Sequence, residues 1–241
     1  MKKIITLVSA IIIVCAVMFY SLYKIISWQK ENKSINNEIK IINEIVDINQ
    51  EITEEQFNEL KKINKDTVGY LNVLNTTINM PVVQTNNNDY YLNHSYESTK
   101  NSAGWPFLDY RNKINDLDQN SIIYAHGRKD GTMFGYLNEI FSNDYLKKDN
   151  HTITLDTNQY TYEFQVFSFY KIKTTSDYLV TNFKDEEYNE FLRLIQSRSI
   201  HDFGIEVNDT DKILTLSTCY NNTIKTVMHA KLISQEVKQD V

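Results

Sequence analysis

The sequence is poor in the residues that build flexible loops, disulfide frameworks and phosphate-binding turns. Its 241 residues include only 6 Gly, 2 Pro and 2 Cys. So few glycines argue against Gly-rich phosphate loops and long flexible linkers. The two cysteines, Cys15 and Cys219, exclude a disulfide framework and a zinc site made from a cysteine cluster. No His-x-x-x-His pair is present either, so we expect no metal and no cofactor.

Positive charge is also scarce. The chain has 25 Lys and Arg against 31 Asp and Glu, a formal net charge of −6. A protein that coats nucleic acid needs clustered positive charge, so nucleic acid is not an expected partner. With 23% charged and 41% hydrophobic residues, a disordered or collagen-like chain is excluded. Aromatic residues make up 12% of the chain, which favours a β-rich fold.

The N-terminal segment is long, apolar and uncharged. From Ile4 to Tyr23 no side chain is charged, and as a helix this stretch is roughly 30 Å long, enough to cross a bilayer. The alternative is a cleaved signal peptide, whose apolar core is usually about 7–15 residues with a small-residue cleavage site after it. The run here is longer and SLYKIISW at its end contains no such site. We therefore predict that residues 1–28 are an uncleaved, single-pass membrane anchor.

Orientation in the cell membrane depends on the lysines at both ends of this segment. Lys2 and Lys3 precede it and Lys24 follows. The first two, with the amino terminus, favour an N-terminus inside the cell and residues 29–241 outside it.

Residues 29–65 are predicted to form a helical stalk. Ile35, Ile39 and Ile42 recur at helical spacing. Thr53 and Gln56 fit a capping box at the start of a second short helix. The simplest interpretation is a helix-turn-helix, because a coiled-coil dimer would need more heptads than this segment contains.

From residue 66 to 241 the pattern predicts a mainly β domain. The eight candidate strands are 68–74, 77–83, 104–109, 121–125, 152–156, 160–173, 211–218 and 225–233. In the sixth, Tyr160, Tyr162 and Phe164 alternate with polar residues, as in a half-buried strand. Eight short strands favour a closed barrel or a sandwich. An amphipathic helix at 185–198 falls between the sixth and seventh strands, which makes it an insertion on a barrel.

Cys219 is the one thiol outside the predicted membrane segment. It ends the apolar strand at 211–218, where a side chain is held firmly but lies at the barrel rim. A thiolate beside a cation is a strong nucleophile, whereas a buried structural cysteine is the common alternative. An unpaired cysteine in an exported chain is less easily explained as structural.

A cysteine nucleophile needs an acid–base partner, and His126 has the most suitable position of five histidines. It follows the strand at 121–125 and precedes Gly127, so it also lies at a strand end. His229 lies inside the last strand, where a packed or solvated role is expected. Three further histidines lie in polar loops and are expected to be solvated: His94, His151 and His201.

Acyl transfer also needs a donor for the developing oxyanion. The last strand returns from Cys219 and begins near Lys225, so a tight turn would bring this lysine close to the thiol. The alternative is an ordinary solvated lysine.

Taken together, these residues resemble the sortases, and class B sortases in particular. Residues 215–219 read TLSTC, the active-site motif of the family, and 124–127 look like its YGH segment. The TMF at 132–134 and the helix at 185–198 are similar to features of class B members. Four more segments match in order and spacing: 68–71, 81–84, 89–92 and 108–111.

The resemblance, over about residues 30–235, implies an eight-stranded β-barrel cysteine transpeptidase that anchors proteins to a Gram-positive cell wall. Sortases cut a secreted protein at its sorting signal, after the Thr of an LPxTG-like or NPxTx-like motif. Cys219 would form a thioacyl enzyme. His126 would protonate the leaving amine and then help deprotonate the amine of a peptidoglycan precursor. Without that acceptor, slow hydrolysis would give a thiol-protease activity.

The sequence departs from the family pattern at Lys225. The family's third residue is an Arg on the last strand, and counting back from residues 229–232 places Lys225 there, after a short connection. A lysine keeps the charge but loses the two-pronged donor set of a guanidinium. Arg111 and Arg128 are the other candidate sources of a guanidinium. A second departure, Leu74 where many relatives carry Pro, affects only a strand end.

The resemblance also implies four substrate-binding residues: Asn88, Leu92, Ser217 and Thr218. Asn88 and Leu92 correspond to class B positions that touch the sorting signal, and Ser217 and Thr218 adjoin the nucleophile. For Asn88 the alternative role is that of an ordinary turn residue, and for Leu92 that of a packed helix residue.

Two alternative functions of the protein also stay open. One is a barrel that binds sorting signals with weak turnover because of Lys225, and the other is a thiol hydrolase.

Overall fold

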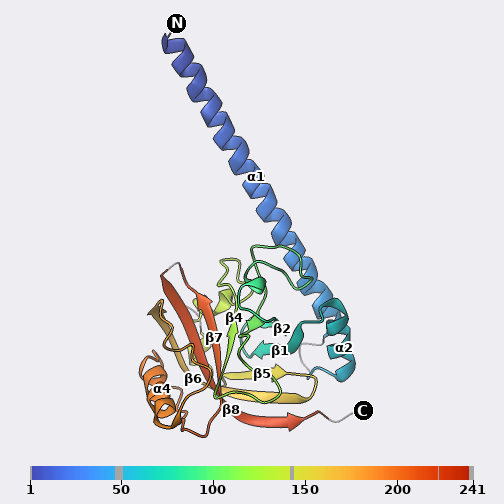
Figure 1. The fold of residues 1–241 in the computed structure, drawn as a ribbon, viewed down its shortest axis with the longest axis vertical. Helices are drawn as coiled ribbons and strands as arrows, with labels where there is room; N and C mark the ends of the chain where they lie inside the picture. The colour runs from blue at the N-terminus through green and yellow to red at the C-terminus, as the bar shows by residue number, and fades with distance from the viewer. Residues whose placement is uncertain (1, 47–50, 142–143, 222, 239–241) are drawn as a thin grey trace.

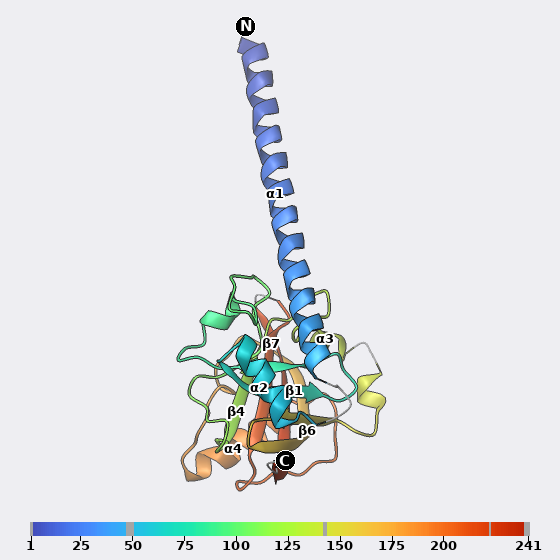
Figure 2. The ribbon, with the colours of Figure 1, turned by 90° about the vertical axis from the view of Figure 1, so that its right-hand side faces the viewer.

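A single long helix projects from a β-barrel (Figures 1 and 2). The computed structural model describes residues 2–46, 51–141, 144–221 and 223–238. Helix α1 spans Lys2–Ile45, so the predicted anchor and the first part of the predicted stalk form one continuous helix. The large apolar side chains between Ile4 and Trp28 are exposed. Among the described residues, α1 alone is long and apolar enough to cross a membrane, a test that an N-terminal signal sequence also passes.

The second half of the predicted stalk lies against the barrel. Helix α2 spans Glu54–Ile63, and its predicted capping box is present. The Gln56 amide donates to the Thr53 hydroxyl, and the Thr53 amide donates to the Gln56 side chain. Six apolar side chains from the whole predicted stalk, residues 29–65, are buried in the same cluster as the barrel interior: Ile35, Ile42, Val46, Ile52, Phe57 and Leu60.

Eight strands close into a barrel, which confirms the predicted fold. They are β1 (Thr67–Val73), β2 (Asn79–Val83), β3 (Phe107–Leu108), β4 (Asn120–Tyr124), β5 (Thr152–Asp156), β6 (Tyr160–Lys173), β7 (Ile213–Cys219) and β8 (Ile224–Val237). Their order around the barrel is β1-β2-β3-β4-β7-β8-β6-β5. Strands β4 and β7 are neighbours and run parallel, so their C-terminal ends reach the same rim of the barrel.

Strand β7 is buried on both faces. Leu214 and Leu216 belong to the interior cluster, whereas Ile213 belongs to a second cluster outside the barrel. Helix α4 (Asp185–Ser197) covers this outer cluster, beside β6 and β8 in Figure 1. Burial on both faces fits the sequence of β7, ILTLSTC, which has apolar and small hydroxyl side chains and no charged one.

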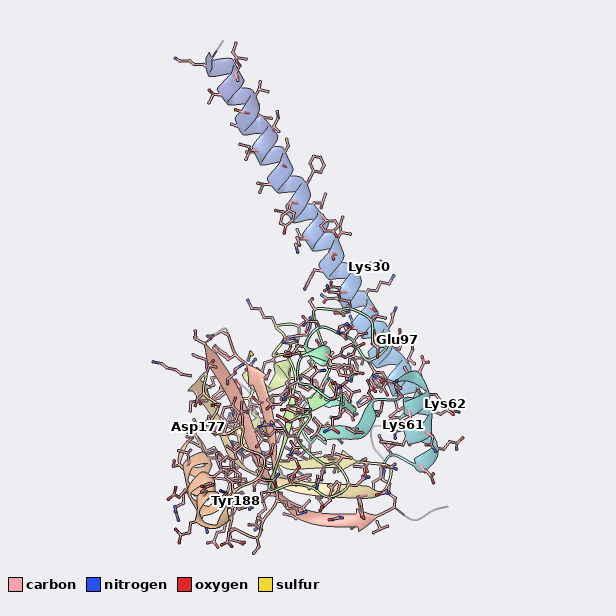
Figure 3. All side chains as sticks on the ribbon, viewed as in Figure 1. Lys30, Lys61, Lys62, Glu97, Asp177 and Tyr188 are labelled. Atoms are coloured by element: carbon pink, nitrogen blue, oxygen red, sulfur yellow. The ribbon has the colours of Figure 1, made fainter. Side chains whose placement is uncertain are left out.

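Helix α4 is the predicted insertion between the sixth and seventh strands. Tyr188, labelled in Figure 3, is fully buried, and its hydroxyl donates to the carbonyl oxygens of Gln119 and Asp211. The apolar stripe that it shares with neighbouring helix residues packs on the outer face of the barrel: Tyr188, Phe191, Leu192 and Ile195.

Candidate active site

Cys219 and Lys225 face each other at the end of the β7–β8 hairpin. The two antiparallel strands stay in register up to the pair Cys219–Lys225. Both side chains are half-buried. The Lys225 Nζ donates a hydrogen bond to the Cys219 Sγ over 2.9 Å. The short connection between them therefore brings an amine directly onto the thiol sulfur.

Alternation along β7 decides which way the thiol points. Leu214 and Leu216 point into the barrel, so Cys219, an odd number of residues further on, lies on the outer face. Ser217 shares that face, and its hydroxyl lies 3.0 Å from the hydroxyl of Tyr178. The candidate nucleophile therefore lies at the rim, at the edge of the outer cluster and outside the closed interior.

His126 reaches the same rim from β4. Its Nε2 lies 2.8 Å from the carbonyl oxygen of Leu92. A carbonyl oxygen can only accept, so the proton of this hydrogen bond lies on Nε2. Gly127, the next residue, lies against Cys219: a Cβ built on it would collide with the Cys219 carbonyl oxygen and with Nδ2 of Asn138. The chain segment of His126 is thus in direct contact with that of Cys219.

Asn138, on helix α3 (Gly135–Glu139), holds the backbone peptide group of Cys219 in place. The Asn138 Nδ2 donates to the Cys219 carbonyl oxygen over 3.1 Å, and the Thr226 hydroxyl donates to the Asn138 Oδ1 over 2.5 Å. Thr218 donates its hydroxyl to the carbonyl oxygen of Ala125 over 2.8 Å, which ties β7 to the end of β4. Sequence patterns gave no indication of Asn138 or Thr226.

The four predicted substrate-binding residues have different surroundings. Thr218 is 2% exposed and Ser217 is 5% exposed, and both hydroxyls have protein partners. Asn88 is half-buried, its Nδ2 donating to Asp109 and its Oδ1 accepting from the Tyr110 amide. Leu92, at the end of the short helix η1 (Tyr90–Leu92), packs against the interior cluster and presents its carbonyl oxygen to His126.

Asp109 organises the polar groups beside this rim. It is fully buried, and burial alone would raise the pKa of its carboxyl group. Hydrogen bonds from Arg111, Tyr124 and Asn88 nevertheless hold that pKa below its ordinary value. Arg111 is bound to Asp109 through both Nε and Nη2, at 2.8 and 2.7 Å.

Arg128, the second arginine that the sequence offers as a source of a guanidinium, forms its hydrogen bonds with residues other than Cys219. Arg128 contacts Asp130, Thr132 and Asn32. Within the described residues, Lys225 is therefore the cation that is hydrogen-bonded to Cys219.

The remaining histidines lie in other environments, and one expectation was wrong. His151, expected to be solvated, is only 5% exposed because it packs among the rings of Tyr145, His201 and Phe203. Burial lowers the pKa of His151. His94 is half-buried and stacks on Tyr90.

His229 is packed, one of the two roles expected for it. Its Nδ1 lies 2.8 Å from the Thr215 hydroxyl, and its Nε2 lies 2.9 Å from the Tyr170 hydroxyl. Complete burial, with a smaller contribution from Arg198, lowers the pKa of His229 to about 3. His229 is therefore a neutral structural residue at physiological pH.

In the part of the chain that the structure describes, the side chains offer no set of metal ligands. No group of three or more His, Cys, Asp or Glu side chains there could hold a metal ion. The candidate chemistry at this rim consists of a thiol, an amine and an imidazole.

Comparisons with known proteins point to one family. Residues 71–233 match the family model described as the sortase domain. A sortase B of Staphylococcus aureus is 35% identical over 243 residues, covering 97% of this chain and 98% of that protein. A sortase B of Listeria monocytogenes is 34% identical over 219 residues, covering 88% of each.

Solved structures give the same result. A Staphylococcus aureus sortase B–substrate complex is similar with a TM-score of 0.75 and 33% identity, covering 87% of this chain and 99% of that one. The sortase B of Clostridium perfringens is similar with a TM-score of 0.67 and 33% identity, covering 73% of this chain and 99% of that one.

Proposed function

Because this chain belongs to the sortase family, among its class B members, we propose that it is a membrane-anchored cysteine transpeptidase. Its substrates are secreted proteins with a C-terminal LPxTG-like or NPxTx-like sorting signal, and its acceptor is the amine of a peptidoglycan precursor. The observation that carries the proposal is the contact between the Lys225 amine and the Cys219 sulfur, on the rim that His126 also reaches.

In the first half of the proposed reaction, Cys219 attacks the carbonyl carbon of the signal's Thr. A cation beside a thiol favours the nucleophilic thiolate, and the Lys225 ammonium has that position. Once the substrate arrives, the same group is available to the developing oxyanion. As the C–N bond of the signal breaks, His126 in its imidazolium form protonates the leaving amine and remains as a neutral imidazole. The proton on Nε2, which is donated to the Leu92 carbonyl oxygen in this structure, is suited to that transfer.

In the second half, the thioacyl group on Cys219 is transferred to the acceptor amine. His126, having lost its proton, takes one from the incoming amine. Attack on the thioester then restores the free thiol. Water in place of the amine gives slow hydrolysis.

For substrate binding, we retain Asn88 and Leu92, of which Leu92 presents its carbonyl oxygen to His126. The Staphylococcus aureus relative is described in complex with a substrate, which supports a binding site in this fold. The buried, partnered hydroxyls of Ser217 and Thr218 favour a different role for these two residues, which is to position the end of β7.

The proposed topology is single-pass. Residues 1–28 anchor the chain in the membrane with the N-terminus inside the cell. Residues 29–65 connect this anchor to residues 66–241, which form the catalytic barrel outside the cell. The exposed apolar surface of α1 supports this arrangement.

The decisive test is the intact mass of the chain after incubation with a library of LPxTG-like and NPxTx-like peptides. We expect a thioacyl adduct on the wild type and none on Cys219→Ala. Turnover should be lost in this variant, because removing the covalent route raises the activation free energy by several kcal/mol. His126→Ala should be nearly as inactive, while His201→Ala serves as a matched control with normal turnover. Substantial cleavage by pure Cys219→Ala would refute the proposal.

Lys225 has its own test. Removing an oxyanion donor typically lowers kcat by about 10²-fold or more, so we expect that loss in Lys225→Ala. Lys225→Arg should retain or raise kcat, because a guanidinium offers two parallel donors. Lys231→Ala, which changes another lysine of β8, should behave like the wild type. If Lys225→Arg turned a nearly inert protein into a fast one, the natural chain would be a signal-binding barrel with weak turnover.

A further inference from the structure

The amine on the nucleophile has a second chemical capacity. The Lys225 Nζ lies 2.9 Å from the Cys219 Sγ. An arginine in this place would stay protonated and could not act as a nucleophile. A lysine amine can lose its proton and form a covalent bond with a carbonyl carbon. We propose that Lys225 is an acyl-acceptor site, to which an acyl group carried by Cys219 is transferred as a stable amide.

The proposed step is an S-to-N acyl transfer within the β7–β8 hairpin. The neutral Lys225 Nζ attacks the thioester carbonyl carbon, a C–N bond forms and the C–S bond breaks. The electron pair of the broken bond goes to sulfur, and the proton lost by the amine ends on the Cys219 thiol. The step consumes no oxidant, reductant or cofactor, and an amide is more stable than the thioester that it replaces.

Geometry favours this transfer. The acyl carbon is bonded to Sγ, which lies 2.9 Å from the Lys225 Nζ, so rotation about the bonds to sulfur can bring that carbon within the about 3–3.5 Å of a reactive contact with the amine. Antiparallel pairing fixes Cys219 opposite Lys225, which keeps the two groups together without a conformational change.

Charge favours the transfer as well. A thiolate attracts the ammonium, whereas an acylated sulfur carries no charge, so acylation removes that attraction. Within the described residues no carboxylate forms an ion pair with Lys225. Burial raises the pKa of Tyr178, and smaller electrostatic contributions come from Lys225, which lowers it, and Cys219, which raises it. His126 is the other titratable group that reaches this rim, through the contact of Gly127 with the Cys219 carbonyl oxygen.

The consequence is self-inactivation. An acylated Lys225 has lost its positive charge and occupies the rim with its acyl group. Transfer to Lys225 competes with transfer to an external amine, so the amide should accumulate when the acceptor is scarce. This inference rests on the proposed role of Cys219 as an acyl carrier.

The test uses the full-length chain in detergent with p-nitrophenyl acetate, an acyl donor that needs no sorting-signal recognition. After acetylation, hydroxylamine removes thioesters but leaves amides. Peptide mapping should then find acetyl on Lys225 of the wild type and at least about tenfold less on Lys225 of Cys219→Ala, because the transfer is intramolecular. In Lys225→Arg the acetyl group should stay on Cys219 until hydroxylamine removes it.

Lys231 is the matched control, since it lies on the same strand and can react only directly. Its acetylation should be equal in the wild type and in Cys219→Ala. Equal acetylation of Lys225 in those two proteins would overturn the inference, as would an unacylated Cys219 or a Cys219 thioester that persists without transfer. Peptide turnover is measured separately: a chain that transfers acetyl to Lys225 but ignores every sorting-signal peptide keeps this inference and refutes the proposed substrate.

Discussion

At the scale of single residues, Gly127 shows how little room separates the two strand ends of the site. It follows His126 and packs on the carbonyl oxygen of Cys219. The Asn138 amide and the Thr218 hydroxyl are its other neighbours, the latter 2.9 Å from a Cβ built there. A side chain at this position would push the nucleophile's peptide away from Asn138, so glycine is required by the close approach of two backbones.

Gly127→Ala should therefore reduce activity more than stability. Overpacking typically costs about 1–3 kcal/mol, whereas a shift of about 1 Å in a reacting group can cost about 10²-fold in rate. Peptide turnover and thermal unfolding, measured on the same preparation, separate the two effects.

Gly204→Ala is the control for this experiment. Gly204 has φ +68° and no atom within 4 Å of its Cβ position, so alanine there strains the backbone without touching the site. It should lower stability and leave kcat unchanged. Equal kcat values for the two variants would show that Gly127 has no special role.

The residues of the site differ in how far the sequence could predict them. Cys219 and His126 were identified because each ends an apolar strand, and Lys225 because the next strand starts there. Asn138 could not be identified, because its importance comes from contacts with Cys219 and Thr226, which lie more than eighty positions along the chain. A hydrogen bond between distant segments leaves no local pattern.

At the scale of elements, the outer face of β6, β7 and β8 combines apolar packing with a buried polar chain. His229 is sandwiched between the Tyr170 and Thr215 hydroxyls. Thr215 in turn donates to Asn120 on β4 over 2.6 Å, and the Asn120 amide donates to the Val180 carbonyl oxygen over 2.8 Å. This chain of hydrogen bonds connects four strands, β6, β8, β7 and β4, to the segment that leads into α4.

His229 should make folding sensitive to acid. Its pKa falls from an ordinary 6.5 to about 3 on folding, so between these values the unfolded chain binds more protons than the folded one. Stability therefore decreases as the pH falls through 6.5, by about 2 kcal/mol at a pH of about 5. Denaturant unfolding at neutral and acidic pH measures this loss.

His229→Gln is the comparison that isolates this contribution, because glutamine can form hydrogen bonds but does not titrate. The variant should be less stable than the wild type at neutral pH, yet lose less stability on acidification. A loss equal to that of the wild type would assign the acid sensitivity to other groups, such as the carboxyl group of Asp109.

Element positions were largely predictable, with two informative differences. The third strand was expected at 104–109 but spans only Phe107–Leu108, because Gly104 has φ +62° and the chain turns there. The last strand continues to Val237, beyond the predicted end at residue 233, since pairing with β6 sustains it after its apolar pattern stops. Local pattern gives the element type, whereas partners decide where it ends.

At the scale of the whole molecule, α1 is joined to the loops around the site. The Glu38 carboxylate accepts from the Glu97 amide over 3.1 Å, and Figure 3 shows Glu97 beside the lower part of the helix. Asn101 donates to the Glu31 carbonyl oxygen over 3.0 Å. Arg128, two residues after His126, donates to Asn32 over 2.6 Å. Helix α1 thus contacts chain segments that lie before and after His126 in the sequence.

These contacts change what we expect from truncation. The strand pattern alone suggests that residues 66–241 could fold by themselves, but residues 29–65 supply buried side chains to the barrel's own cluster. Fully burying one large apolar side chain contributes about 1.5–3 kcal/mol, and a domain's net stability is only about 5–15 kcal/mol. A chain that starts at residue 66 should therefore be several kcal/mol less stable than one that starts at residue 30.

Circular dichroism melts of the two truncated chains provide the measurement, with the full-length protein in detergent as reference. The chain from residue 30 keeps Ile35, Phe57 and Leu60 and should unfold cooperatively near the reference temperature. The chain from residue 66 exposes the barrel surface that these side chains cover, so it should melt earlier or aggregate. Identical melting of the two would mean that α2 and the lower part of α1 rest on the barrel without stabilising it, and that the catalytic unit begins at residue 66.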